Sequence, residues 1–254
     1  MAQVGTTQYT SVTEAAAAAG DQVVVLLMDC ADATINSDVT IDLSGYALTN
    51  VNVTNGTLYL IDSATDDYEG TYGSATVSGN VASFVNCNGK DYLVVAENGV
   101  YSAHCYAVKL THVSLDATND ALGYKAEFFG DEVAKSHVKS IGFNLWVTEG
   151  RVVTRTVEGK TDATLRLKNI MAMGGGEMDV NGNAFVVFDV EDKTVTSESY
   201  GTSMKETLQN VDAAWSGYTQ IQKNAVVALC QKFYNVVENW KLDNIFPIID
   251  IPIQ

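Results

Sequence analysis

The sequence predicts a mostly β fold with a short solenoid-like β region, an immunoglobulin-like β-sandwich and C-terminal helices. Most apolar residues lie in short runs with a period of two, which is the pattern of half-buried strands. Glycine and asparagine separate these runs at short intervals, as they do in turns. Helical patterns are confined to the two ends of the chain. With 254 residues the chain can bury a sizeable core, and we expect parts at residues 1–74, 75–200 and 201–254.

The first part is expected to begin with a helix and to continue as stacked strands. Ser11 and Glu14 form a capping-box pattern, the alanines after them favour a helix, and Gly20 ends it. The apolar run 23–28 suits a strand covered on both faces, and 39–43 alternates like a half-buried strand. Very short strands follow at 46–49, 51–54 and 57–61. Hairpins would explain them, but we expect a few solenoid-like rungs, with the spacing lost after residue 62.

The second part has the longer strands and turn signals of a sandwich. Asn88-Gly89 and Asn98-Gly99 favour tight hairpins, and the acidic segment 116–120 predicts a loop. Asn181-Gly182 is best explained as a further turn. The spacing suggests an immunoglobulin-like sandwich, although the Cys…Trp…Cys signature of true immunoglobulin domains is missing. The expected strands are 75–77, 83–85, 92–96, 106–115, 123–129, 140–147, 151–157, 164–170 and 184–190.

The third part is expected to be helical and to lie on the sandwich. Ser203 and Glu206 form a second capping box, and Thr219 and Gln222 form a third. The last helix carries an apolar face made of Ile221, Ala225, Leu229, Phe233, Val236, Val237 and Trp240. Such a face must lie against something apolar. We expect the chain's own sheet to cover it, and a homo-oligomer through helix 219–240 is the alternative.

The charge balance excludes several partners. A formal net charge of -16 repels phosphate backbones and anionic headgroups, so we expect no nucleic acid partner. No apolar run approaches the length of about 20 residues that a membrane span needs, so we expect no membrane insertion. The segment 135–168 is locally basic. It is expected to be a solvated strand face, and an acidic partner is the alternative.

The cysteines and the N-terminus say little about the compartment. Cys30, Cys87, Cys105 and Cys230 are scattered singly, which gives a zinc site no support. Cys87 and Cys105 are the expected pair in an oxidising compartment, but buried free thiols are typical of a chain of this length. Residues 1–20 lack the basic start and apolar run of a secretory signal. The chain is therefore either cytosolic at birth or a mature segment.

The richest acidic cluster is the one candidate metal site. Asp62, Asp66, Asp67 and Glu69 lie close enough in sequence to supply oxygen ligands to calcium. Their spacing is not that of an EF-hand, and a solvated acidic loop explains them as well. Asn181 and its neighbours at 179–183 are a weaker candidate. Calcium is thus the sole cofactor considered.

Catalytic patterns are missing from the sequence. His104, His112 and His137 lie in or beside predicted strands, and nothing in the sequence pairs any of them with a nucleophile. There is no G-x-S-x-G elbow and no phosphate-binding loop. We therefore expect no enzyme, although a glycosidase on a β scaffold would hide its carboxylates from such a scan. Tyrosines concentrated in the first half provide strand packing or a platform for sugars.

The opening of the chain resembles that of large surface proteins of Gram-positive gut bacteria. The resemblance rests on residues 9–15, 20–27 and 40–49, which start a helix, a strand and β-helix-like rungs in those proteins. Residues 123–128 and 141–143 look like the β-sandwich modules that often follow. The segments 164–170 and 184–199 continue the likeness.

That resemblance implies a non-enzymatic structural or binding module, displayed extracellularly or on a cell surface. Such a module would act through a β surface on a protein or glycan partner. Two alternatives stay open. One is a bacteriophage virion structural or decoration protein, which would be located in the phage particle. The other is a carbohydrate-active β enzyme or glycan-binding module.

Overall fold

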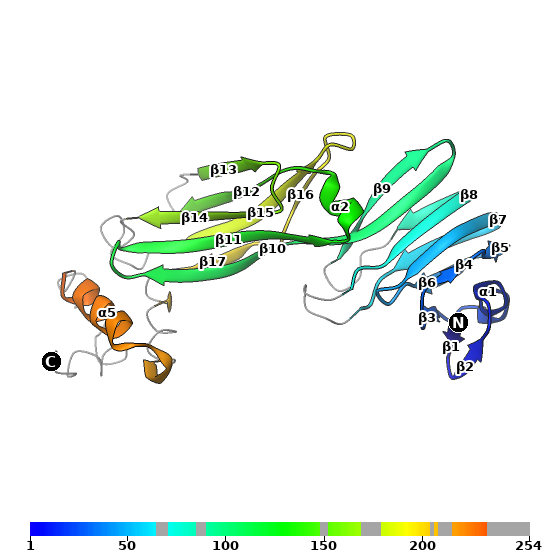
Figure 1. Ribbon diagram of the computed structural model, residues 1–254, viewed down its shortest axis with the longest axis horizontal. Helices are drawn as coiled ribbons and strands as arrows, with labels where there is room; N and C mark the ends of the chain where they lie inside the picture. The colour runs from blue at the N-terminus through cyan, green and yellow to red at the C-terminus, as the bar shows by residue number, and fades with distance from the viewer. Residues whose placement is uncertain are drawn as a thin grey trace. The chain divides into compact units, whose positions relative to one another are not determined.

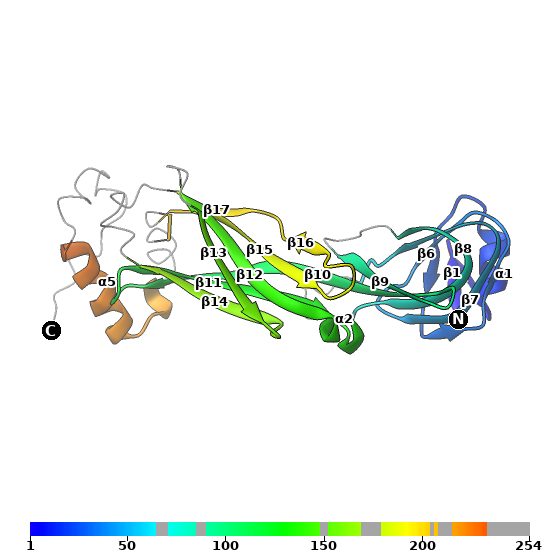
Figure 2. The same ribbon diagram turned by 90° about the horizontal axis from the view of Figure 1, so that it is seen from above.

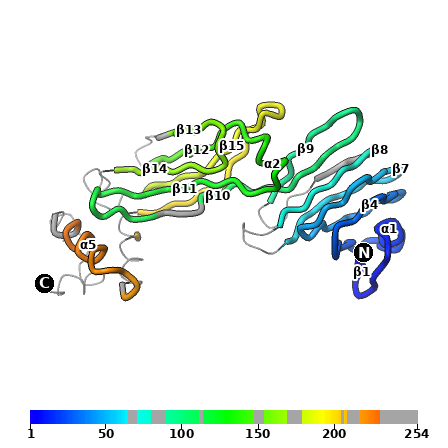
Figure 3. The backbone as a smooth tube through the Cα atoms, in the orientation of Figure 1, coloured from blue at the N-terminus to red at the C-terminus, as the bar shows by residue number. Residues whose placement is uncertain are grey.

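The computed structural model confirms the mostly β fold and divides the chain into two compact units (Figures 1 and 3). It describes residues 1–64, 71–84, 90–147, 152–168, 179–203, 206–207 and 215–232. The first unit, called the solenoid unit, comprises Met1–Val108, Phe128–Val138 and Phe188–Lys193. The second, called the sandwich unit, comprises Lys109–Glu127, Lys139–Val187 and Thr194–Gln254.

The solenoid unit is built from short strands and two helices. Its elements are β1 (Ala2–Val4), β2 (Thr7–Tyr9), α1 (Val12–Ala19), β3 (Val24–Leu26), β4 (Cys30–Ala31), β5 (Thr34–Ile35), β6 (Val39–Asp42), β7 (Ala47–Ile61), β8 (Ser74–Phe84), β9 (Asp91–Glu97) and α2 (Glu132–Ser136). Two long strands, β10 (Val100–Asp116) and β11 (Ala121–Gly130), contribute residues to both units.

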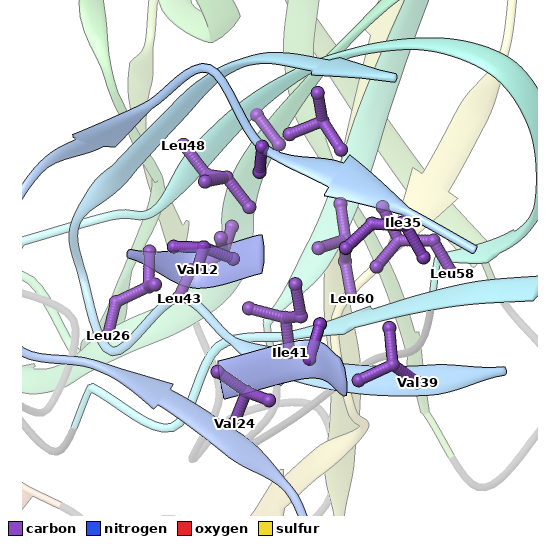
Figure 4. Packing of buried hydrophobic residues seen from close by; sticks show 14 of the residues in the cluster. Val12, Val24, Leu26, Ile35, Val39, Ile41, Leu43, Leu48, Leu58 and Leu60 are labelled. Atoms are coloured by element: carbon purple, nitrogen blue, oxygen red, sulfur yellow. The ribbon is translucent and has the colours of Figure 1, made fainter. Parts of the chain in front are cut away.

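Parallel pairing makes successive stretches of the chain stack as coils. Strand β7 pairs in parallel with β4, β5 and β6, and also with β8. Leu48 lies beside Cys30, and Leu60 beside Ile41, so one coil takes 18 or 19 residues. Aliphatic side chains from these coils converge on one core, in which Ile41 and Leu60 are fully buried (Figure 4). This stacking buries one face of every coil and is the basis of the unit's stability.

The corners of the coils stack as well. Asp32 and Asn50 lie 18 residues apart, both have positive φ angles of 59° and 57°, and Asn50 Nδ2 donates to Asp32 Oδ1 at 3.2 Å. At another corner Gly56 has φ 77° and lies directly against the backbone of Ser37. Asparagine, aspartate and glycine are the residues that accept this conformation most readily.

The expected rungs at 46–49, 51–54 and 57–61 need correction. They are consecutive parts of the single strand β7, bent by irregularities between Leu48 and Val51 and between Val53 and Leu58. The stack also continues past Asp62 into β8. The division expected at residue 74 does not coincide with the observed one, because β8, β9 and the start of β10 pair within the solenoid unit.

Helix α1 covers the N-terminal end of the stack. As predicted, Ser11 is the N-cap and accepts a hydrogen bond from the Glu14 N–H at 3.2 Å, and Gly20 ends the helix. The helix buries one face against β1, β3 and β5, through Val12, Ala15, Ala16 and Ala19. The small alanine side chains allow the helix to approach the strands closely.

The sandwich unit has the strand order of an immunoglobulin-like fold. Its further elements are β12 (Val138–Val147), β13 (Val152–Glu158), β14 (Asp162–Lys168), β15 (Val180–Phe188), β16 (Thr194–Thr196), β17 (Tyr200–Thr202), the 3-10 helix η1 (Trp215–Gly217) and α5 (Gln220–Lys232). One sheet runs β14-β11-β10 and the other β13-β12-β15-β16, with β17 also on β15 (Figure 2). The chain changes sheet after β11, β13 and β14, which is the Greek-key connection of such sandwiches.

Two predicted turns have different outcomes. Asn98-Gly99 joins β9 to β10 with φ angles of 51° and 78°, which confirms the tight hairpin. Asn181-Gly182 instead lies inside β15, where Asn181 pairs with Gly201 of β17. A Cβ on Gly182 would lie 2.3 Å from Leu145 Cδ2, so this glycine serves close packing rather than a turn. Asn88-Gly89 lies outside the described residues.

The helical pattern at the C-terminal end is confirmed in part. Ser203 and Glu206 exchange hydrogen bonds as a capping box, and Thr219 and Gln222 do so at the start of α5. The helix buries Val226, Val227 and Leu229. Ile221, expected on the buried face, is 82% exposed. The rest of the expected apolar face, from residue 233 on, lies outside the described residues. Within them no helix is long and apolar enough to cross a membrane.

Candidate functional site

A cleft in the sandwich unit is the best-formed concave site in the described part of the chain. Its volume is about 650 Å³, within the range of about 300–1,000 Å³ that small-molecule sites occupy. Its walls come from the β10–β11 loop, strand β14, the segment of β17 that leads into the Ser203 cap, and helix α5. The lining residues are Ser114, Leu115, Asp116, Ala117, Thr118, Arg166, Tyr200, Thr202, Thr207, Tyr218, Ile221, Gln222, Ala225 and Val226.

An ion pair defines the charged wall of this cleft. Asp116 accepts hydrogen bonds from the Asn119 side chain at 2.9 Å and from Arg166 Nη1 at 2.9 Å. The hydrogen bonds from Asn119, and further the charge of Arg166, hold the pKa of Asp116 below its usual value against the opposing effect of burial. The carboxylate is thus ionised at neutral pH. The Arg166 side chain is 65% exposed, so its guanidinium group is accessible to a ligand.

Two tyrosines give the cleft its aromatic character. Tyr200 begins β17 and is 44% exposed, so much of its ring is accessible. Tyr218 lies just before α5, where the Thr219–Gln222 cap fixes the start of the helix. In that cap Gln222 Oε1 accepts the Thr219 N–H at 2.8 Å, and the amide nitrogen of Gln222 takes no part. The cleft thus combines aromatic rings with donor and acceptor groups.

Sequence reasoning did not find this cleft. Its residues come from segments around 114–118, 166, 200–207 and 218–226, which only the fold brings together. The separate signals were visible, since the acidic loop, the two capping boxes and Arg166 in the basic segment were each recognised. The tyrosines of the first half, considered as a sugar platform, do not line it.

The acidic cluster considered for calcium is only partly described. Asp62 is 1% exposed, and its two carboxylate oxygens accept backbone N–H groups of Gly45 at 2.8 Å, Ala64 at 3.3 Å and Gly73 at 2.9 Å. Those bonds tie the turn between two coils together. Asp66, Asp67 and Glu69 lie outside the described residues, within which no cluster of three or more metal-ligating side chains occurs. Calcium binding by this loop stays a prediction.

The histidines are more organised than the sequence suggested. On β10, His104 Nδ1 lies 2.7 Å from Asp131 Oδ2, and its Nε2 is hydrogen-bonded to Ser102 Oγ. His137, which ends α2, lies 2.8 Å from Asp189 Oδ1. Helix α2 itself was not predicted, because five residues are too few for a helical pattern. Its N-cap, Asp131, is the acidic partner that the sequence scan missed.

Comparison with known proteins gives no family. No protein-family model matches the sequence, and no curated protein matches it. Among solved structures, similarity is found to the β-glucuronidase of Parabacteroides merdae, with a TM-score of 0.28 and 14% identity over 41% of this chain and 15% of that chain. The same enzyme with glycerol in its active site gives 0.29 and 14% identity, over 41% and 14%. The function must therefore be argued from the residues of this chain.

Proposed function

We propose that the chain is a binding module and that the cleft of the sandwich unit takes an oligosaccharide. The observation that carries this proposal is the combination of Tyr200 and Tyr218 with the Asp116–Arg166 ion pair around one cavity. Sugars present apolar faces to aromatic rings and hydroxyl groups to charged and amide side chains. Display of the module on a bacterial surface is part of the proposal and is supported by the sequence resemblance.

The charges around the cleft favour a carbohydrate over an acidic polymer. The chain carries a net charge of -16, which repels polyanions at long range. Inside the cleft the charge of Arg166 is matched by that of Asp116, so no cationic cluster awaits a phosphate or sulfate group. A paired carboxylate and guanidinium instead offer acceptors and donors side by side, which suits vicinal hydroxyl groups.

Glycan-array binding by the full chain, followed by calorimetric titration of the best oligosaccharide, tests the proposal. We expect Tyr218→Ala and Tyr200→Ala each to weaken binding by roughly 3- to 10-fold, because one aromatic contact is worth about 0.5–1.5 kcal/mol. Tyr59→Ala is the matched control, since Tyr59 is also 38% exposed but lies on β7 of the solenoid unit. Its affinity should equal that of the unmodified chain.

Two results would overturn the assignment. One is the absence of any glycan ligand on an array that includes bacterial wall and mucin sugars. The other is a glycan affinity that the Tyr200 and Tyr218 variants leave unchanged, which would place binding elsewhere on the molecule. Light scattering on the eluting protein should be recorded with each variant. A stable oligomer that the exposed Ile221 controls would assign this rim to contact between copies of the chain.

A further inference from the structure

Three side chains of the solenoid unit are arranged as a nucleophile, a base and an orienting carboxylate. Ser102 and His104 are two residues apart on β10, so their side chains leave the same face of the strand. Strand β10 is held on both edges there, because Ser102 lies opposite Thr76 of β8 and Val95 of β9. Asp131 reaches the same place as the N-cap of α2.

The hydrogen bonds fix the direction in which protons can move. An ionised carboxylate only accepts, so the Nδ1–H of a neutral His104 ring donates to Asp131 Oδ2, at 2.7 Å. Nε2 is then an acceptor, and the Ser102 hydroxyl donates to it. The second oxygen of Asp131 accepts the Ala134 N–H at 2.8 Å, which holds the carboxylate in place. His104 is 8% exposed, which shields the ring from competing water.

The pKa of Asp131 agrees with this geometry. Burial acts to raise its pKa, but the hydrogen bonds from His104 and from the backbone N–H groups at the start of α2 outweigh burial and lower it. The carboxylate is therefore charged over the whole range in which an imidazole can act as a base.

We propose that Ser102, His104 and Asp131 form a nucleophilic relay that hydrolyses esters with small acyl groups. As Ser102 Oγ bonds to the ester carbonyl carbon, His104 Nε2 takes the hydroxyl proton. The C–O bond to the alcohol breaks, and the leaving oxygen receives that proton. Water then attacks the acyl-serine through the same base, which releases the carboxylic acid and restores Ser102.

The surroundings of Ser102 favour a small acyl group. Ser102 is half-buried, and Leu93, which lies opposite His104 on β9, is 1% exposed, so the space on this face is limited. Thr76 lies opposite Ser102 in the antiparallel pair and shares its face, which provides a hydroxyl donor beside the nucleophile. This activity would belong to the solenoid unit and would not depend on the cleft of the sandwich unit.

A fluorophosphonate probe, which reacts with activated serines, tests the relay on the full chain. Peptide mass spectrometry should place the adduct on Ser102, and hydrolysis of p-nitrophenyl acetate should follow the same residue. We expect His104→Gln to slow labelling roughly 100-fold, because general-base assistance typically contributes at least that factor. Asp131→Asn should slow it at least tenfold, by roughly the loss expected of an orienting group, while asparagine preserves the helix cap.

The second His–Asp pair is the matched control. His137→Gln removes the pair with Asp189 but leaves Ser102 and its partners in place, so labelling should equal that of the unmodified chain. For Asp131, a positioning residue, the pH profile separates orientation from mere structure. The pH of half-maximal labelling should fall in Asp131→Asn, because the charge that favours a protonated ring is gone.

The proposal is overturned if the unmodified chain gives no adduct at Ser102, a result that depends on no variant. It is also overturned if Ser102 labels at the same rate in His104→Gln, or if the adduct spreads evenly over exposed serines. Loss of glycan binding with intact Ser102 labelling would count against the cleft alone.

Discussion

Replacing Gly56 with alanine tests the coil stacking most directly. Gly56 has φ 77°, and a Cβ there would lie 2.3 Å from Ser37 C, 2.6 Å from Asp38 N and 2.8 Å from Ser37 Cα. All three atoms belong to the backbone of the neighbouring coil, so no flexible side chain can move aside. The left-handed conformation costs a non-glycine residue about 1–2 kcal/mol, and forced displacement of packed atoms typically adds about 1–3 kcal/mol. We expect Gly56→Ala to destabilise the solenoid unit by about 2–5 kcal/mol.

Gly99 provides the matched control for this measurement. Its φ is 78°, but a Cβ there would meet nothing within 4 Å. Gly99→Ala should therefore show the conformational cost of about 1–2 kcal/mol without the clash. The difference between the two variants isolates the close contact between coils.

Urea unfolding with two probes can localise the effect. The three tryptophans, Trp146, Trp215 and Trp240, all belong to the sandwich unit. Tryptophan fluorescence therefore reports that unit, whereas circular dichroism reports both. We expect Gly56→Ala to shift an early dichroism transition and to leave the fluorescence midpoint in place. Equal costs for Gly56→Ala and Gly99→Ala would refute the stacking of Gly56 on the neighbouring backbone.

Three further predictions follow from burial and charge. Leu60→Ala should cost about 2–5 kcal/mol of unfolding free energy, because Leu60 is fully buried between coils, and thermal melting would detect its loss. Because the pKa of Asp131 is lowered in the folded chain, its contribution to stability is complete above the pKa of an unfolded aspartate, about 3.9. Acid titration should thus show the stability gap between the unmodified chain and Asp131→Asn closing as the pH falls below that value. Cys105 is 1% exposed and burial raises the pKa of its thiol, so iodoacetamide should alkylate the half-buried Cys30 first, as peptide mapping would show.

Local chemistry explains which elements could be predicted. The caps at Ser11, Ser203 and Thr219 depend on side chains that bond to backbone within three residues, so they are visible in sequence. The Asn98-Gly99 hairpin depends on two positive φ angles at adjacent residues. The strand period of two identified the sandwich for the same reason, since it requires no knowledge of the partner strand.

Partner choice explains what could not be predicted. The three segments of β7 look like separate rungs, because the partners that make them one strand are 18 or 19 residues away. Ser102 and His104 were visible as neighbours on a strand, but Asp131 is 27 residues from His104 and belongs to a helix too short to recognise. The cleft likewise depends on the docking of α5, which buries Val226 and Val227 but leaves Ile221 exposed.

The closed ends of the coil stack make its length adjustable in whole steps. At one end β1 and the short polar strand β2 turn antiparallel and α1 lies over them, and at the other β8 is paired with the antiparallel strand β10. Neither edge can recruit another copy of the chain through free backbone groups. An insertion of one coil of 18 or 19 residues between Asp42 and Ala47 would therefore lengthen the core and preserve both ends. Insertions of other lengths would move Asp32-type corners out of line with Asn50.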